Sequence, residues 1–202
     1  MNRYVNEFLN MRCSGDVLNA VSRMSKAEKE ITESMAVIKR LKPLVLQHPM
    51  EYSVIDLCAG NALTGVIAVH MLPVKQVIAI DKKKRKGNYD IVKRFIYLEM
   101  DINQKDAIST TDILISVHPC QTADRIIDIF NNTPAHALIL MPCCNGMSDD
   151  VTGKPWLHAK MSEYDCWTYH LANNIQKAKV NIYTDNMVLS PKNNIIVAKR
   201  GK

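Results

Sequence analysis

Nowhere does the sequence contain an apolar run that approaches the roughly 20 residues needed by a membrane-spanning helix. Its opening stretch, MNRYVNEFLN, carries charges and no cleavable apolar segment, so we expect no signal peptide. The six cysteines form neither an even framework nor a C-x-x-C pair, which favours reduced thiols. Together these absences predict a cytoplasmic protein that does not enter a membrane.

Three recognition patterns are missing as well. The dinucleotide fingerprint G-x-G-x-x-G does not occur. No pair of cysteines or histidines has the spacing of a zinc finger, so we expect no metal site. Aromatic residues make up 6% of the chain and are scattered along it, which argues against a platform for stacking bases.

The chain is long and apolar enough for one globular domain with an appended segment, since 47% of its 202 residues are hydrophobic. Residues 1–48 are predicted to form a helical segment, whose main helix opens at a capping box from Ser25 to Glu28 and runs to Val45. We expect this segment to cover an edge of the sheet or to help hold a substrate. Residues 49–202 are predicted to form the main domain.

Residues 54–81 carry the clearest pattern in the chain. The apolar run Val54–Leu57 is typical of a buried parallel strand, and Gly60 permits a tight turn after it. A helix is predicted over Ala62–Leu72, followed by a second strand over Val77–Ile80 that ends at Asp81. A carboxylate at that strand end can accept both hydroxyls of a ribose, while the helix N-terminus faces the turn.

Strands and helices alternate through the rest of the domain. The spacing of the early strands permits right-handed crossovers and a parallel sheet, whereas the last two strands are close enough for a hairpin. The further strands are predicted at 95–100, 113–117, 137–141, 180–189 and 195–199, with helices at 123–130 and 161–175.

Polar or reactive residues follow five successive strands of the predicted sheet. Ligands bind at the carboxyl ends of parallel strands, so these positions predict one binding edge. They are Asp56 to Gly60, Asp81, Asp101, His118 to Cys120, and Pro142 to Cys144.

The stretch DLCAGNA resembles motif I of S-adenosylmethionine-dependent methyltransferases, D-x-x-x-G-x-G, with Ala62 in place of the last glycine. The resemblance implies a Rossmann-like α/β fold with a seven-stranded sheet whose last strand is antiparallel. It also implies S-adenosylmethionine as the cofactor. The residues that it assigns to the cofactor site are Asp56, Cys58, Ala59, Gly60, Asn61, Asp81, Lys82, Asp101, Ile102 and His118.

The ends of the fourth and fifth strands are similar to those of one methyltransferase branch, which includes the tRNA ribose 2′-O-methyltransferases. That branch ends its fourth strand in H-x-C-G-x-x-T-D and its fifth in Cys-Cys. His118, Cys120 and Asp124 match the first pattern and Cys143-Cys144 the second, while Gln121 replaces the glycine. The zinc-finger cysteines of the tRNA enzymes are absent. The resemblance therefore implies an RNA substrate, tRNA or rRNA, methylated on ribose or base.

His118 and the cysteines leave two chemistries open. His118 either accepts a proton from the methyl acceptor or holds the cofactor loop by hydrogen bonds. Alternatively Cys120, Cys143 or Cys144 adds to carbon-6 of cytosine, as in 5-methylcytosine enzymes, although the D-A-P-C and T-C-S patterns of those enzymes are absent. Buried cysteine as a small apolar residue is the simpler interpretation.

A basic run, Lys82 to Lys86, follows Asp81 and lies at the rim of the predicted site, where it either contacts RNA phosphates or is a solvated loop. The formal net charge of +6 favours an anionic partner. Two further alternatives are a small-molecule methyltransferase and a non-catalytic partner protein that keeps the fold. Ala62 and Gln121 favour the second of these.

Overall fold

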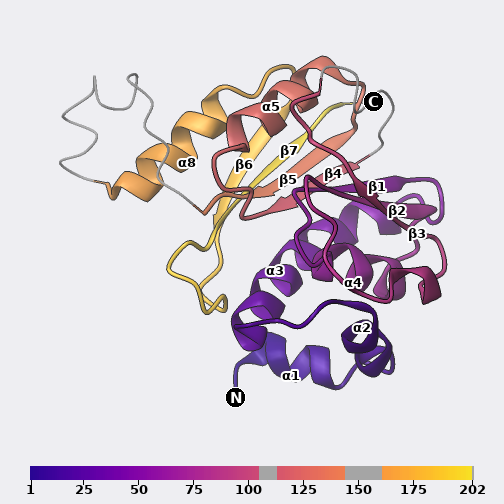
Figure 1. The fold of residues 1–202 in the computed structure, drawn as a ribbon. Helices are drawn as coiled ribbons and strands as arrows, with labels where there is room; N and C mark the ends of the chain where they lie inside the picture. Colours follow the sequence, from indigo (N-terminus) through magenta and orange to yellow (C-terminus); the bar gives the residue numbers. More distant parts are fainter. Residues whose placement is uncertain (105–112, 144–160, 202) are drawn as a thin grey trace.

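Seven strands form one sheet in the order β3-β2-β1-β4-β5-β7-β6 (Figure 1). The structure is a computed structural model that describes residues 1–104, 113–143 and 161–201. The strands are β1 Ser53–Leu57, β2 Gln76–Asp81, β3 Phe95–Glu99, β4 Ile113–Val117, β5 Ala137–Met141, β6 Lys179–Thr184 and β7 Asn194–Lys199.

The direction of the strands confirms the predicted fold class. β1 to β5 pair in parallel, and β7 is antiparallel to both β5 and β6. The order changes direction between β1 and β4, which is where ligands bind in open α/β sheets. The fold is thus a Rossmann-like seven-stranded sheet with an antiparallel last strand and N-terminal helices.

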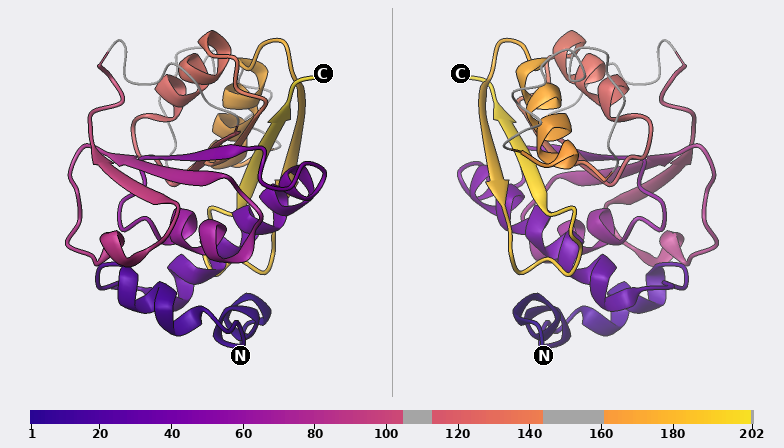
Figure 2. Two further views of the ribbon diagram at one scale, coloured as in Figure 1. Left: turned by 90° about the vertical axis from the view of Figure 1, so that its right-hand side faces the viewer. Right: turned by 90° about the vertical axis from the view of Figure 1, so that its left-hand side faces the viewer.

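Helices cover both faces of the sheet (Figures 1 and 2). On one face lie α1 Arg3–Leu9, α2 Ser14–Ala20, α3 Ala27–Leu46 and α4 Leu63–Met71; on the other lie α5 Ala123–Asn132 and α8 Glu163–Asn173. Side chains of each strand alternate between the two faces. On β4, for example, Ile113 and Ile115 join the core under α3 and α4, while Leu114 joins the core under α5 and α8.

Two predicted boundaries are wrong. The helix α3 begins at Ala27 and not in a Ser25 capping box, because Lys26 is its N-cap and the Lys26 amide donates to Glu30 Oε1 at 3.3 Å. The strand β6 ends at Thr184 and does not reach residue 189, because Asp185 is buried and its main chain starts a turn that is closed by the amide of Val188.

The N-terminal helices share one core with the rest of this face. Ile31, Met35 and Leu41 of α3 belong to the same buried cluster as Val66 of α4 and Ile139 of β5. The separation of residues 1–48 from 49–202 into two units remains a prediction. Within the described part of the chain, no helix combines the length and the apolar character needed to cross a membrane.

Candidate functional site

The loop after β1 has an unusual backbone at alternate residues. Cys58, Gly60 and Ala62 all adopt the left-handed conformation, with φ between 56° and 58°. Ala62 therefore keeps the backbone that a glycine favours, at a typical cost of about 1–2 kcal/mol for a residue with a Cβ.

Asp81 at the end of β2 holds this loop. Its Oδ2 accepts the amide of Gly60 at 2.9 Å, and its Oδ1 accepts the amide of Lys83 at 3.1 Å. From β3, the hydroxyl of Tyr97 donates to the carbonyl of Gly60 at 2.6 Å. An ionised carboxylate has about four acceptor positions, so Asp81 keeps acceptor capacity for a ligand.

Asp56 lies behind the loop, in β1, and is buried. Its Oδ2 accepts the amide of Gly65 in α4 at 3.0 Å, and a Cβ on Gly65 would approach that same oxygen to 3.0 Å. Burial raises the pKa of Asp56 to about 7, and the nearby charge of Asp81 adds to the rise. Asp56 thus ties α4 to the strand.

A cavity of about 540 Å³ opens at the ends of β1 to β4; we call it the strand-end cavity. Its lining residues include Asp81 at the end of β2 with Lys82 after it, Asp101 and Ile102 after β3, and the segment 118–122 after β4. The carboxylate of Asp101 accepts the amide of Asn103 at 3.0 Å and pairs with Lys82 Nζ at 3.2 Å. The Asn103 amide and then Lys82 lower the pKa of Asp101, which stays ionised.

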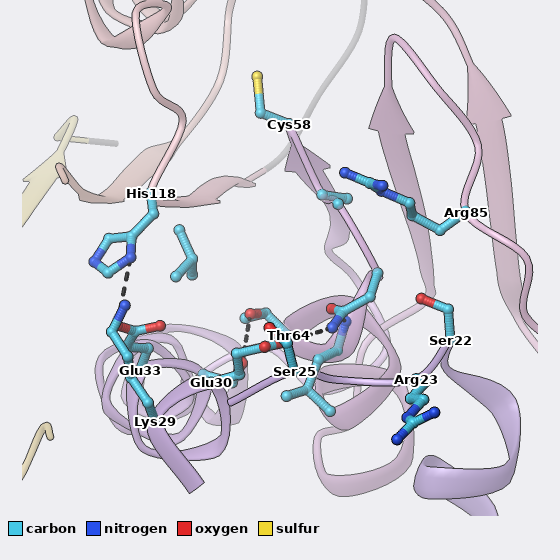
Figure 3. Close-up of a pocket in the computed structure, with 16 residues that line it drawn as sticks. Ser22, Arg23, Ser25, Lys29, Glu30, Glu33, Cys58, Thr64, Arg85 and His118 are labelled. Atoms are coloured by element: carbon cyan, nitrogen blue, oxygen red, sulfur yellow. Dashed lines mark hydrogen bonds and ion pairs between the residues drawn. The ribbon is translucent and has the colours of Figure 1, made fainter. Parts of the chain in front are cut away.

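A second cavity, of about 460 Å³, lies between the β1–α4 loop and the N-terminal helices (Figure 3); we call it the helix-side cavity. Both cavities are lined by Cys58, Gly60 and His118, so they meet at these residues. The residues that line the helix-side cavity and that sequence reasoning missed are Ser22, Arg23, Ser25, Lys29, Glu30, Glu33, Ser34, Leu63, Thr64 and Val117.

Hydrogen bonds tie α3 to the loop between β1 and α4. Asn61 Nδ2 donates to Glu30 Oε2 at 2.7 Å, and Asn61 Oδ1 accepts the amide of Leu63. The hydroxyls of Ser34 and Thr64 lie 2.9 Å apart. The helix α3 is therefore part of the wall of the site.

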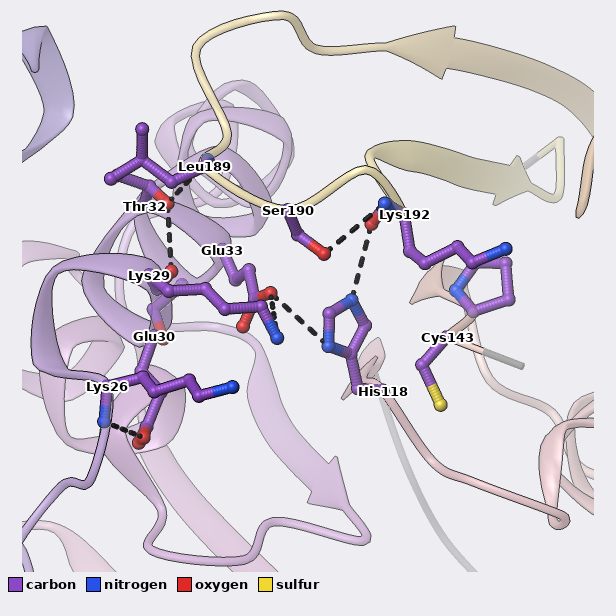
Figure 4. Close-up of polar contacts among 12 residues, drawn as sticks. Lys26, Lys29, Glu30, Thr32, Glu33, His118, Cys143, Leu189, Ser190 and Lys192 are labelled. Carbon is purple, nitrogen blue, oxygen red and sulfur yellow. Dashed lines mark hydrogen bonds and ion pairs between the residues drawn. The ribbon is translucent and has the colours of Figure 1, made fainter.

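His118 lies where the two cavities meet, and both of its ring nitrogens face oxygen atoms (Figure 4). Nδ1 is 3.4 Å from Glu33 Oε1, and Nε2 is 3.3 Å from the carbonyl of Lys192. A neutral imidazole carries one N–H, so it can donate to only one of these oxygens, whereas the protonated ring can donate to both. Burial nevertheless lowers the pKa of His118, against the opposing effect of Glu33.

Glu33 is a buried charged residue of α3, and its side chain is 5% exposed. Among the described residues its Oε1 has no hydrogen-bond partner, although Lys29 Nζ lies 3.3 Å away in an ion pair. A buried carboxylate oxygen in this state is costly unless a ligand or a proton completes its contacts. One signal was available in the sequence, because Glu33 lies at helical spacing from the apolar residues Ala36, Val37 and Leu44.

The structure also brings together the cysteines that follow β4 and β5. Cys120 Sγ and Cys143 Sγ lie 2.7 Å apart, and Cys120 is exposed in the strand-end cavity. Cys58 is different, because burial raises the pKa of its thiol to about 11 and keeps it protonated. Cys144 lies outside the described residues, as do Trp156 and His158.

The basic run divides between the two cavities. Lys82 pairs with Asp101 at the rim of the strand-end cavity, and Arg85 lines the helix-side cavity. All five side chains from Lys82 to Lys86 are exposed. The run therefore places Lys82 at one cavity and Arg85 at the other, with three exposed lysines next to them in the sequence.

Comparison with known proteins finds a match to one family model, described as a methyltransferase domain, over residues 26–147. The match begins just before α3 and takes in the loop after β1, Asp81, Asp101, His118 and the cysteines that follow β4 and β5. A comparison with curated protein sequences finds no significant match.

Among solved structures, the chain is similar to the precorrin-6y C5,15-methyltransferase from Geobacter metallireducens GS-15 (13% identity, TM-score 0.51, 83% of this chain and 87% of that one). It is also similar to the plantazolicin methyltransferase BpumL in complex with SAH (10% identity, TM-score 0.55, 98% and 94%). A third is the methyltransferase domain of the bacterial CtHen1 (12% identity, TM-score 0.55, 83% and 99%). At these identities the likeness shows the fold.

Proposed function

The chain belongs to the methyltransferase-domain family, and on that premise we propose that it transfers a methyl group from S-adenosylmethionine to RNA. The observation that carries the proposal is the meeting of two cavities at Cys58, Gly60 and His118. Each has the size of a small-molecule site, and these three shared residues place the two cavities next to each other. Similar structures include one solved with SAH and one solved with S-adenosylmethionine.

The residues present fit this cofactor. In our proposal Asp81 accepts the ribose hydroxyls, and Asp101 with the buried Ile102 holds the adenine in the strand-end cavity. The amino-acid end then lies in the helix-side cavity, where Glu33 Oε1 can accept from an ammonium group, since it accepts no hydrogen bond among the described residues besides its ion pair with Lys29. S-adenosylmethionine, when bound, supplies an electrophilic methyl group, and the protein's main task is to hold a nucleophile in line with it.

We assign the removal of the acceptor's proton to His118. Its lowered pKa keeps the ring neutral near pH 7, which is the state that a base requires. Once protonated, the ring can donate to both Glu33 and the Lys192 carbonyl, so the surrounding oxygens favour the product of the proton transfer. This arrangement suits a hydroxyl or amine acceptor, and it needs no covalent bond to the protein.

RNA is the substrate favoured by charge. The net charge is +6, and the exposed run Lys82 to Lys86 contributes Lys82 to the strand-end cavity and Arg85 to the helix-side cavity. Phosphate groups on either side of a target nucleotide would meet these side chains. The similarity of His118, Cys120 and Cys143 to the strand ends of tRNA ribose 2′-O-methyltransferases points in the same direction.

The test is transfer of tritium from methyl-labelled S-adenosylmethionine into the total RNA, protein and metabolite fractions of a cell lysate. We expect label in RNA, and nucleoside analysis then identifies the methylated atom. Label confined to the metabolite fraction would support a small-molecule methyltransferase instead. Cofactor binding with no transfer to any fraction would indicate a non-catalytic partner protein.

A further inference from the structure

A third cavity, of about 450 Å³, lies away from the proposed active site, between α3 and the outer strands β6 and β7; we call it the basic groove. Figure 2 shows α3 passing beside these two strands. Five cationic side chains line the groove: Lys39, Arg40, Lys179, Lys199 and Arg200. No carboxylate is among its lining residues.

The pairing of β6 with β7 places two of these lysines directly opposite each other, which destabilises the sheet. Lys179 of β6 is paired directly with Lys199 of β7, and both side chains line the groove. Like charges directly opposite each other on a sheet are destabilising. An anion bound between the two ammonium groups would turn this repulsion into attraction.

The other cations are held in place by the fold. Lys39 and Arg40 share the buried carboxylate of Asp185 at 3.7 and 3.9 Å, while Tyr4 donates its hydroxyl to that carboxylate at 2.6 Å. The guanidinium of Arg40 also lies over the exposed ring of Tyr183, at 4.1 Å from its centroid. One carboxylate therefore faces two cations and is already bound by a hydroxyl, so the groove keeps a net positive charge.

Arg200 contributes charge, and its Nη1 and Nη2 atoms donate to the carbonyls of Phe130, Thr133 and Ala135, whereas its Nε has no hydrogen-bond partner among the described residues. Apolar side chains, among them Val197, form the floor of the groove. A ligand for this groove thus has repeated negative charges and uncharged surface between them.

Helix α3 runs from the helix-side cavity to the groove. Glu33 and Arg40 are two turns apart on the same side of α3, which is about 10 Å along its axis. The loop after β6 supplies the carbonyl of Lys192 to His118, and β6 itself supplies Tyr183 to the groove. A polymer with its reacting unit at His118 can therefore extend into the groove.

We propose that the basic groove binds the phosphodiester backbone of the substrate RNA at nucleotides beyond the one that is methylated. The identification of this polymer as RNA rests on the proposed function. An acidic polypeptide fits less well, because an extended peptide adds to a sheet through the main chain of an edge strand. The groove instead uses side chains on the face of β6 and β7, at alternate positions such as Lys179 and Tyr183.

The experiment compares K179T/K199T with the matched variant K75T/K93T, which removes the same charge from exposed lysines outside the groove. Binding of a fluorescein-labelled polyuridine oligonucleotide is measured by anisotropy over a range of salt concentrations. We expect K179T/K199T to bind more weakly, with a slope of log K against log salt reduced by about 1.4, since each phosphate contact contributes roughly 0.7. The matched variant should behave as the wild type.

Measurements of methyl transfer and of melting temperature distinguish a failure of this proposal from a failure of the function on which it rests. K179T/K199T should transfer methyl groups to total tRNA with a raised KM and an unchanged kcat, and its melting temperature should not fall. If wild type and K179T/K199T methylate RNA with the same KM and salt slope, the groove is not an RNA site although the function stands. If wild type methylates no RNA, the proposed function itself fails. A competition experiment compares polyglutamate with unlabelled polyuridine at equal total charge. If polyglutamate displaces the labelled oligonucleotide equally effectively, the assignment to RNA is wrong.

Discussion

Asp56 makes folding depend on pH at the scale of a single residue. Burial raises its pKa from 3.8 to about 7, so between these values the folded protein holds a proton that the unfolded chain has released. The contribution of Asp56 to the free energy of unfolding is therefore complete below pH 4 and is lost as the pH rises to about 7. The loss is roughly 1.4 kcal/mol for each unit by which the pKa is raised.

Asp56→Asn should remove this dependence while its amide oxygen still accepts the Gly65 amide. We expect urea unfolding to show Asp56→Asn gaining stability relative to wild type from pH 4 to pH 7, with a constant difference above that range. Asp90→Asn, at an exposed position, is the control. Parallel curves for wild type and Asp56→Asn would contradict a buried, protonated Asp56.

His118 and Glu33 should control the pH dependence of methyl transfer. Because burial lowers the pKa of His118, the acid limb of kcat/KM should lie below pH 6.5. Glu33 favours the protonated ring, so Glu33→Gln should move that limb to still lower pH and reduce the rate. His118→Ala should lower the rate by about 10²-fold or more. An acid limb that stays in place in Glu33→Gln would show that the two side chains do not act together.

At the scale of elements, the loop after β2 should contact phosphates. Lys83, Lys84 and Lys86 can be replaced by serine while Lys82 keeps its pair with Asp101 and Arg85 its place in the helix-side cavity. RNA affinity should fall and its salt dependence should flatten, because fewer counterions are released. The control replaces the exposed Arg12, Lys75 and Lys93 by serine. An equal salt slope in both variants would leave the basic run as a solvated loop.

The ends of β4 and β5 distinguish two kinds of chemistry. The 5-methylcytosine enzymes carry their cysteine nucleophile in D-A-P-C and T-C-S patterns, and neither pattern occurs in this sequence. We therefore expect Cys120→Ser, Cys143→Ser and Cys144→Ser to affect activity only through packing.

RNA that contains 5-azacytidine, which traps adducts at carbon-6, checks the cysteine prediction on a denaturing gel. We expect no complex that survives denaturation. Such a complex in the wild type, lost in one cysteine variant, would make that cysteine the nucleophile.

Sequence patterns could locate the strand ends but not the helix that faces them. Asp81, Asp101, His118 and Cys120 line one cavity, as expected, because the carboxyl ends of parallel strands meet at one edge of the sheet. Glu33 was missed because its distance from His118 is set by the packing of α3 on β4 and β5, which no local pattern encodes. The start of α3 was also placed too early, because tertiary packing puts Ser25 in the wall of the helix-side cavity and not in a capping box.

At the scale of the whole molecule, α3 connects the proposed active site with the basic groove. The helix contributes Glu30 and Glu33 to the helix-side cavity and Arg40 to the basic groove. An N-terminal helix thus links cofactor, base and polymer sites in the proposed enzyme. Changes in α3 should therefore affect both RNA binding and catalysis.

The central claim is that S-adenosylmethionine binds across the loop after β1, with Asp81 as an acceptor. The most direct test is the melting temperature of the wild type and of Asp81→Ala, with and without the cofactor or its demethylated product. Both ligands should raise the melting temperature of the wild type, since any ligand of the native state does so. Asp81→Ala should bind more weakly by about 1–3 kcal/mol, the range for a charge-assisted hydrogen bond. A wild-type protein whose melting temperature does not change at millimolar cofactor would contradict the account.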